Sequence, residues 1–142
     1  MPSKKTDELL KILEKETHFD DYIAENAGEF ISASLSELLA EYESKCGLEK
    51  ADIIRNANLD KTYAYQMFSG AKKNPSRDKV LMLCFGMGLS VTDTQTLLKR
   101  AGYPQLYPRI KRDSALIFSL ERKLSVMEAN ELLFDLKEPI LE

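Results

Sequence analysis

The chain lacks tryptophan and has only two cysteines and one histidine among its 142 residues. Cys46 and Cys84 are too few for a disulfide framework and do not have a metal-binding spacing, so we expect two reduced thiols. No apolar run approaches the ~20 residues that span a bilayer, and no signal-peptide core follows the N-terminus. These absences predict a soluble, cytoplasmic protein that does not enter a membrane.

Catalytic signatures are missing as well. One histidine, no glycine-rich phosphate loop, no Ser/His/Asp constellation and no His-Glu-x-x-His or Cys-x-x-Cys motif leave no basis for an active site. We therefore expect a protein that is not an enzyme and that uses neither a cofactor nor a metal ion.

Charge is distributed unevenly along the chain, which carries a formal net charge of −3. Residues 1–50 hold 12 acidic and 6 basic residues, and residues 113–142 hold 7 acidic and 3 basic residues. Residues 51–112 hold 11 basic and 4 acidic residues, a net charge of +7. A basic middle between two acidic flanks favours the binding of a polyanion to the middle segment.

Strand signals are nearly absent, whereas helix signals are frequent. Runs of alternating β-branched and aromatic residues are short, and no Asn-Gly or Asp-Gly hairpin turn occurs. Helix starts are indicated by five residues whose side chains can accept a hydrogen bond from an N–H of the first helical turn: Ser34, Asp60, Ser76, Ser90 and Ser125. Ser34, Ser90 and Ser125 are each followed three residues later by an acidic residue, which is the spacing of a capping box. The sequence therefore predicts an all-α protein.

Apolar spacing divides the chain into three parts. Residues 1–32 are predicted to form an acidic helical arm, residues 33–103 a core of five short helices, and residues 104–142 a C-terminal helical extension. Within the extension, the segment 115–120 is apolar on more than one face, and such a helix is usually buried or covered by a partner. We expect the extension to pack on the core or to form a homodimer through this segment.

Two short helices joined by a tight turn are predicted within residues 48–70. Their buried positions are Ile53, Ile54 and Ala57 before the turn and Leu59, Ala64 and Met67 after it. Asn58 lies in the turn, where a residue that tolerates positive φ is needed. The residues left facing outward on the second helix are Lys61, Thr62, Tyr63, Tyr65 and Gln66. This layout is typical of a helix-turn-helix.

The segment resembles the helix-turn-helix of the Cro/repressor (XRE-like) family, which has the lambda-repressor-like fold of five short helices. The resemblance runs without gaps from residue 48 to residue 70 and more loosely from about residue 34 to residue 102, including the basic loop at 71–76. Asn58 stands where Gly is usual, Ile54 stands where Ala is usual, and the second helix is unusually aromatic. The resemblance implies a five-helix lambda-repressor-like core with extra N-terminal and C-terminal helices.

The function that the resemblance implies is sequence-specific binding of double-stranded DNA, as a transcriptional regulator of bacterial or phage type. Residues 61–68 match the recognition helix, which this family lays in the major groove. The base-reading residues expected on it are Lys61, Thr62, Tyr63, Tyr65 and Gln66. The phosphate contacts expected from the preceding helix and from the basic loop are Lys50, Lys72, Lys73, Asn74, Ser76 and Arg77.

An alternative function is a protein-interaction adaptor or antitoxin-like regulator that keeps the helix-turn-helix fold. Tyrosine is enriched at protein interfaces, so the tyrosines of the second helix favour a protein partner, whereas the net charge of +7 in the middle segment favours DNA.

A second basic cluster lies after the basic loop in the sequence. We interpret it as a solvated surface that also caps the fifth helix: Lys99, Arg100, Arg109, Lys111 and Arg112.

Overall fold

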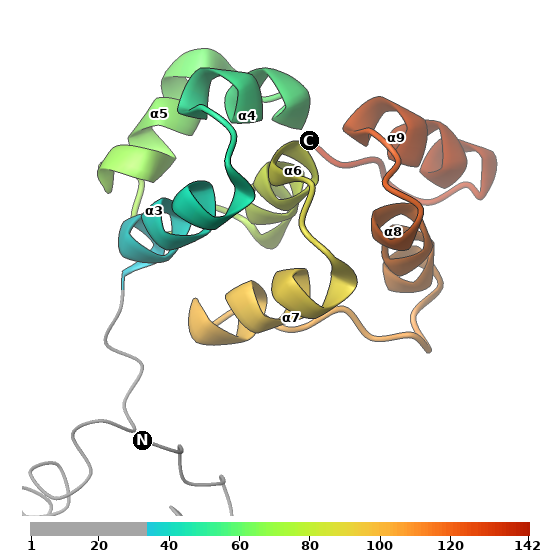
Figure 1. Cartoon of the computed structure of the whole chain (residues 1–142). Coiled ribbons are helices and arrows are strands. Elements are labelled where there is room, and N and C mark those ends of the chain that lie inside the picture. The colour runs from blue at the N-terminus through green and yellow to red at the C-terminus, as the bar shows by residue number, and fades with distance from the viewer. Residues whose placement is uncertain (1–33) are drawn as a thin grey trace, which may run out of the picture. The chain divides into compact units, whose positions relative to one another are not determined.

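The structure is a computed structural model that describes residues 34–142, and the predicted arm of residues 1–32 lies outside the described residues. The described part contains seven helices and no strand, which confirms the all-α prediction for these residues. The helices are α3 (Leu35–Cys46), α4 (Lys50–Ala57), α5 (Lys61–Ser69), α6 (Arg77–Met87), α7 (Val91–Arg100), α8 (Lys111–Glu121) and α9 (Val126–Asp135) (Figure 1). Residues 33–142 form one compact unit, so the C-terminal extension and the preceding helices belong to the same body.

Helix starts follow the predicted capping residues. At all five predicted positions the side chain accepts a hydrogen bond from the backbone N–H three residues later: Ser34, Asp60, Ser76, Ser90 and Ser125. Ser125 also forms the reciprocal half of a capping box, because its own N–H donates to the Glu128 carboxylate at 3.0 Å. The starts of these helices are thus fixed by local chemistry that is visible in the sequence.

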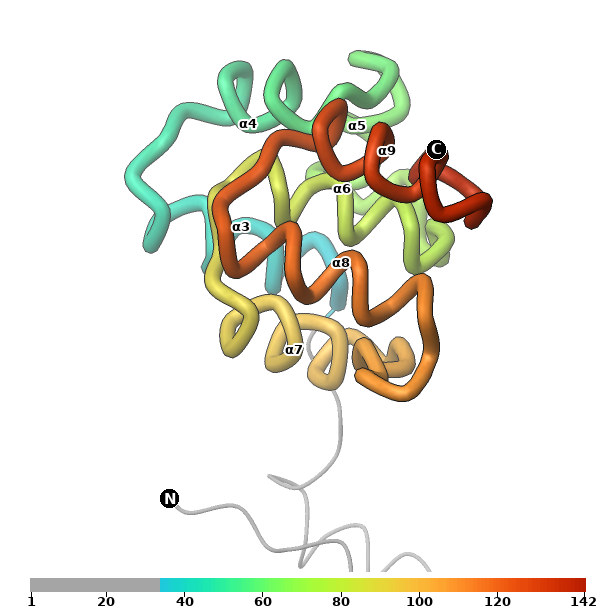
Figure 2. Tube along the Cα trace, turned by 90° about the vertical axis from the view of Figure 1, so that its right-hand side faces the viewer, coloured from blue at the N-terminus to red at the C-terminus, as the bar shows by residue number. Residues whose placement is uncertain are grey.

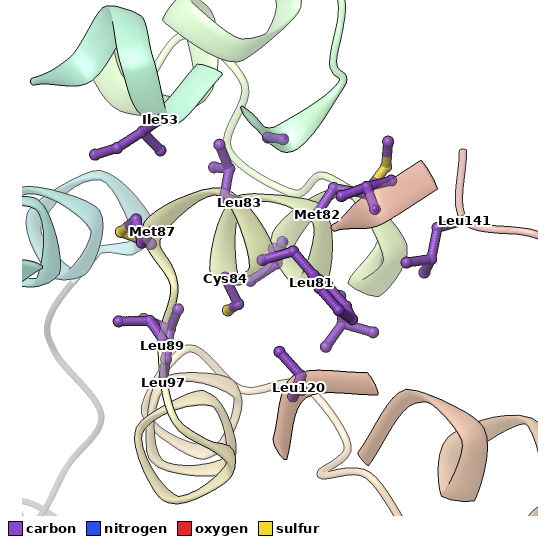
Figure 3. Close-up of a cluster of buried hydrophobic side chains, with 14 of the residues drawn as sticks. Ile53, Leu81, Met82, Leu83, Cys84, Met87, Leu89, Leu97, Leu120 and Leu141 are labelled. Carbon is purple, nitrogen blue, oxygen red and sulfur yellow. The ribbon is translucent and has the colours of Figure 1, made fainter. Parts of the chain in front are cut away.

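Helix α6 lies in the middle of the described helices, where it contacts α3, α4, α7 and α9 (Figures 1 and 2). Every residue from Val80 to Met87 is buried, so most of this helix is enclosed on all sides. Figure 3 shows Leu83 on the side of α6 that faces Ile53 of α4, and Leu81 on the side toward Leu120 of α8. The apolar core therefore runs continuously from α4 through α6 to the C-terminal helices.

A glycine allows α4 and α6 to cross at very short distance. At Gly86, a Cβ atom would lie 2.4 Å from the carbonyl oxygen of Ile53 and 3.0 Å from the backbone nitrogen of Ala57. Atoms in a close-packed interior cannot approach so closely, so any larger residue would push the helices apart. Gly86 therefore sets the position of α4, the helix that precedes the turn into α5.

The C-terminal helices α8 and α9 form an antiparallel pair that packs against the rest of the unit (Figure 2). Ala115, Leu116 and Leu120 of α8 are buried in the common core. Of the two alternatives for the segment 115–120, packing on the core is seen for these three side chains, and a dimer contact through the segment stays a prediction. Phe118 differs from them, since 44% of it is exposed.

Two extended segments of the extension are fastened by side-chain amides. Gln95 of α7 pairs with the backbone of Leu106, donating to its carbonyl and accepting from its N–H, both at 2.7 Å. Asn130 of α9 pairs with the backbone of Leu141 in the same way, at 3.1 Å and 2.7 Å. Each pairing satisfies both hydrogen-bonding groups of a backbone that has no helical partners. Leu106 and Leu141 are held in the core as a result.

Candidate nucleic-acid interface

The turn between α4 and α5 consists of three residues with distinct roles. Asn58 ends α4 in the left-handed conformation, at φ 57° and ψ 35°, as its place in the predicted turn requires. Leu59 packs against the core, and Asp60 begins α5 by accepting a hydrogen bond from the N–H of Tyr63 at 3.0 Å. The turn therefore fixes the direction in which α5 leaves α4.

Four of the five expected base-reading residues gather on one side of α5. Lys61, Thr62 and Tyr65 are exposed, and Gln66 is half-buried. All four line an open hollow of about 460 Å³ between α5 and the start of α4. This side of α5 offers an ammonium group, two hydroxyl groups and an amide, so it can donate and accept hydrogen bonds over most of the helix.

Lys50 lies on the far wall of the same hollow, in the first turn of α4. Its Nζ is 5.2 Å from the ring centre of Phe68 and 3.8 Å from a carboxylate oxygen of Glu43. The contact with Phe68 keeps the ammonium group close to α5, and the contact with Glu43 links it to α3. Because Glu43 offsets part of its charge, Lys50 is a weaker anion contact than an unpaired lysine.

Tyr63 does not share this side of the helix. Its ring is half-buried, and the ammonium groups of Lys72 and Lys79 each lie 5.3 Å from the ring centre. Tyr103 lies beside it, and burial first, then the nearby charge of Tyr63, raises the pKa of the Tyr103 hydroxyl above its ordinary value. Tyr63 is therefore only partly exposed, because its ring packs against the core and near the loop after α5 and the first turn of α6, and its expected base contact stays a prediction.

The loop after α5 presents its polar residues to solvent. Lys72, Lys73 and Asn74 are exposed, and the N–H of Lys72 donates to the carbonyl of Gln66 at 3.0 Å. Ser76 is exposed as well, and its hydroxyl accepts from the N–H of Lys79 at the start of α6. The expected phosphate contacts of this loop thus lie next to α5, in positions that an anion can reach.

Arg77 is the exception among the expected phosphate contacts. Its guanidinium donates to both carboxylate oxygens of Asp113, at 2.7 Å and 3.3 Å, and also contacts the carbonyls of Pro104 and Gln105. The Arg77 side chain is only 23% exposed, and that of Asp113 is 2% exposed. We therefore remove Arg77 from the candidate interface, because its charge is already used to hold α8 against α6.

The second basic cluster does not form one patch. Arg100 pairs with Glu41 of α3, and Arg112 makes two hydrogen bonds to Asp78, at 3.0 Å and 2.8 Å. Lys111 donates to the carbonyl of Leu136 at the end of α9, at 3.1 Å. These side chains join helices of the same unit, and they add little to the surface around α5.

Sequence reasoning missed two residues that shape the loop after α5. Lys79 covers one face of Tyr63, and Tyr103 donates a hydrogen bond from its hydroxyl to the carbonyl of Pro75. Lys79 stands three residues after the predicted cap Ser76, so its place in the first turn of α6 was a usable signal. Tyr103 carried no such signal, because its contact with residue 75 depends on how α7 returns to the loop.

No family model, curated protein or solved structure matches the chain. The functional interpretation therefore depends on the geometry and charge of the surface. Within residues 34–142 there is neither a group of three side chains able to hold a metal ion nor a helix long and apolar enough to cross a membrane. The described surface around α5 offers hydrogen-bonding side chains on the helix and lysines in the elements on either side of it.

Proposed function

We propose that the protein binds double-stranded DNA in a sequence-specific manner, with α4 and α5 acting as a helix-turn-helix within a lambda-repressor-like core. The observation that carries the proposal is the polar outer side of α5, which shares an open hollow with Lys50 of α4 and is followed in the chain by the exposed lysines of the loop 71–76. A recognition helix contacts base edges with its first residues, while the surrounding elements contact phosphates. The polar side of α5 and the lysines beside it support that division of roles.

Direct readout is assigned to the side chains on the exposed side of α5. Gln66 can pair bidentately with the N6 and N7 atoms of adenine, Lys61 can donate to O6 and N7 of guanine, and the methyl group of Thr62 can contact that of thymine. We expect Gln66→Ala to weaken binding to the preferred site by about 1–3 kcal/mol and to relax specificity at one base pair. Selection of duplexes from a random library with each protein would measure this change.

The electrostatic part of binding is assigned to Lys50, Lys72 and Lys73. Each phosphate neutralised by a lysine contributes about −0.9 to the slope of log K against log salt, so three contacts give a slope of about −3. Lys72→Gln/Lys73→Gln should reduce this slope by about 2 and weaken binding to all sequences alike. Fluorescence anisotropy with a labelled random duplex at several salt concentrations would measure both effects.

The matched control removes the same charge elsewhere. Lys123 and Lys137 are exposed lysines of the α8–α9 part of the chain, and Lys123→Gln/Lys137→Gln should leave the slope unchanged. A wild-type protein that does not bind duplex DNA even at low salt would overturn the proposal. Equal losses in the two double variants would instead show that the binding is not localised at the loop after α5.

A role in transcription regulation follows from sequence-specific binding and belongs to the same proposal. A regulator recognises an operator, and a two-fold dimer recognises two half-sites about one helical turn apart. Enrichment of a palindrome in the duplex selection would support this role. A bound set of sequences without any preferred site would contradict it.

The alternative function, an adaptor that binds a protein through α5, has one observation in its favour. Tyr65 is 38% exposed and lies in the hollow beside α4. The other two aromatic residues of the helix are turned toward the chain itself, since Phe68 is buried and Tyr63 is half-buried. A single exposed aromatic residue among basic and polar neighbours favours DNA over a protein partner.

A further inference from the structure

The outer side of the α8–α9 pair carries an open apolar groove of about 420 Å³. Its lining includes Phe118 from α8 and Leu132 and Leu136 from α9. Phe118 is 44% exposed, and Ile110, the residue that caps the start of α8, is 50% exposed. A patch of this kind on a helical pair is a common feature of surfaces that bind another protein.

Charged side chains divide this surface into a basic helix and an acidic helix. Lys111 begins α8 and Arg122 caps its end, whereas the exposed charges of α9 are all acidic, at Glu128, Glu131 and Asp135. Lys111 lines the groove, and the Arg122 guanidinium lies 4.3 Å from the ring centre of Phe118. On α9, Glu128 and Asp135 precede and follow Leu132 by about one turn, so they lie on the same side of the helix.

The antiparallel arrangement of the α8–α9 pair also fixes which charges lie at the same end of the pair. Lys111 at the start of α8 donates to the carbonyl of Leu136 at the end of α9, so Lys111 and Asp135 occupy the same end of the pair. Arg122 and Glu128 occupy the other end, near the connection between the helices. Glu121 ends α8 beside Arg122 and is exposed as well, so the basic character of α8 is weaker at this end.

Two copies of this surface can face each other about a two-fold axis in two ways. With the axis perpendicular to the helices, α8 would lie on the partner's α8, and basic side chains would oppose basic side chains. With the axis parallel to the helices, α8 of each copy lies on α9 of the other, and each basic row meets an acidic row. Only the second arrangement is complementary in charge.

From this complementarity we infer that the groove is occupied by a second copy of the chain, in the arrangement with α8 on the partner's α9. Lys111 then lies beside the partner's Asp135, and Phe118 is covered at the centre of a four-helix contact. The inference goes beyond DNA binding and does not depend on it, because it concerns the chain alone.

Sedimentation equilibrium of the full chain, measured over a range of concentrations, tests this inference. We expect a mass that rises from 16.2 kDa toward twice that value. Lys111→Glu and Asp135→Lys should each raise the dissociation constant by roughly 10-fold or more, because every charge reversal acts at two symmetric contacts. Both changes place favourable charges at the helix ends, so the fold should persist.

Mixing the two variants provides the decisive measurement. In a heterodimer of Lys111→Glu with Asp135→Lys, both contacts become attractive again, so the equimolar mixture should dimerise although each variant alone does so poorly. A loss of folding in either variant cannot produce this recovery. The control Lys99→Glu, an exposed reversal on α7, should leave the mass unchanged.

Three outcomes would overturn the inference. A wild-type chain that stays at 16.2 kDa at all concentrations shows that the groove does not bind a second copy. A dimer that is insensitive to both reversals shows that a different surface is used. A mixture that stays monomeric while each variant is weakened shows that the helices are not paired α8 on α9.

Discussion

The Arg77–Asp113 pair should contribute far more to stability than a surface ion pair of similar length. Asp113→Ala removes a carboxylate that accepts two hydrogen bonds from Arg77 and one from the N–H of Tyr107 at 3.0 Å. Removing one partner of a buried ion pair costs about 3–5 kcal/mol. Because Arg77 is 23% exposed and keeps its contacts with backbone carbonyls, we expect a loss of about 2–4 kcal/mol.

The chain contains a matched control for this substitution. Asp52 pairs with Arg55 at 2.6 Å, close to the 2.7 Å of Asp113 and Arg77, and each aspartate lies three positions into its helix. The difference is exposure, since the Arg55 and Asp52 side chains are 74% and 41% exposed. Asp52→Ala should therefore cost less than about 1 kcal/mol, from a weak surface pair and the helix dipole.

Urea unfolding of the full-length variants, followed by circular dichroism, gives the two free energies. The slope of the unfolding free energy against urea concentration should be the same for all variants, so that a shift in the midpoint of unfolding reports a change in stability. Asp113→Asn keeps the shape of the side chain and one acceptor oxygen, so its loss of stability should lie between those of Asp113→Ala and Asp52→Ala. This variant allows a measurement even where Asp113→Ala does not fold. Losses that agree within about 0.5 kcal/mol for Asp113→Ala and Asp52→Ala would refute the argument from burial.

Four further substitutions or treatments have defined outcomes. Gly86→Ala should lower the free energy of unfolding by about 1–3 kcal/mol in urea titrations, because its Cβ would lie 2.4 Å from the Ile53 carbonyl oxygen. Asn58→Ala should cost about 1 kcal/mol in the same assay, whereas Asn58→Gly should be neutral or slightly stabilising. Burial raises the pKa of Cys84 from 9.0 to about 12, so thiol reagents should modify Cys46 but not Cys84 until urea is added. As pH rises above 9.0, the unfolded chain loses the Cys84 proton first, so the contribution of Cys84 should lower the stability measured in urea between pH 9.0 and about 12 and be absent below that range.

Helix starts could be predicted from the sequence because capping is local. Ser34 and Ser76 each act through an N–H three residues away, so a short window contains the whole interaction. The central place of α6 could not be predicted in that way. Its apolar stripe at Val80, Leu83, Cys84 and Met87 marks a helix, but the number of neighbours that cover a helix depends on distant segments. The continuous apolar run at 81–85 was the signal that α6 is covered on all sides.

The residues around α5 show the same limit of local patterns. Lys61, Thr62 and Tyr65 are exposed as the spacing predicts, because nothing outside the α4–α5 pair covers them in the described part of the chain. Tyr63 is covered by residues from the following loop and from α6, which the spacing within α5 cannot reveal. The pairing of Arg77 could not be predicted for a related reason, since its partner Asp113 lies 36 residues away in the sequence.

The extension is linked to the proposed DNA-binding core by a reciprocal exchange of ion pairs. The dipeptide Arg77-Asp78 begins α6 and the dipeptide Arg112-Asp113 lies in the first turn of α8, and each arginine binds the aspartate of the other dipeptide. Arg112 also donates to the carbonyls of Pro139 and Ile140, which brings the last residues of the chain into the same network. Because α6 starts directly after the loop 71–76, the extension helps to hold that loop in place. The C-terminal helices therefore share one apolar core with the helices before them, and their ion pairs hold the start of α6 directly after the loop.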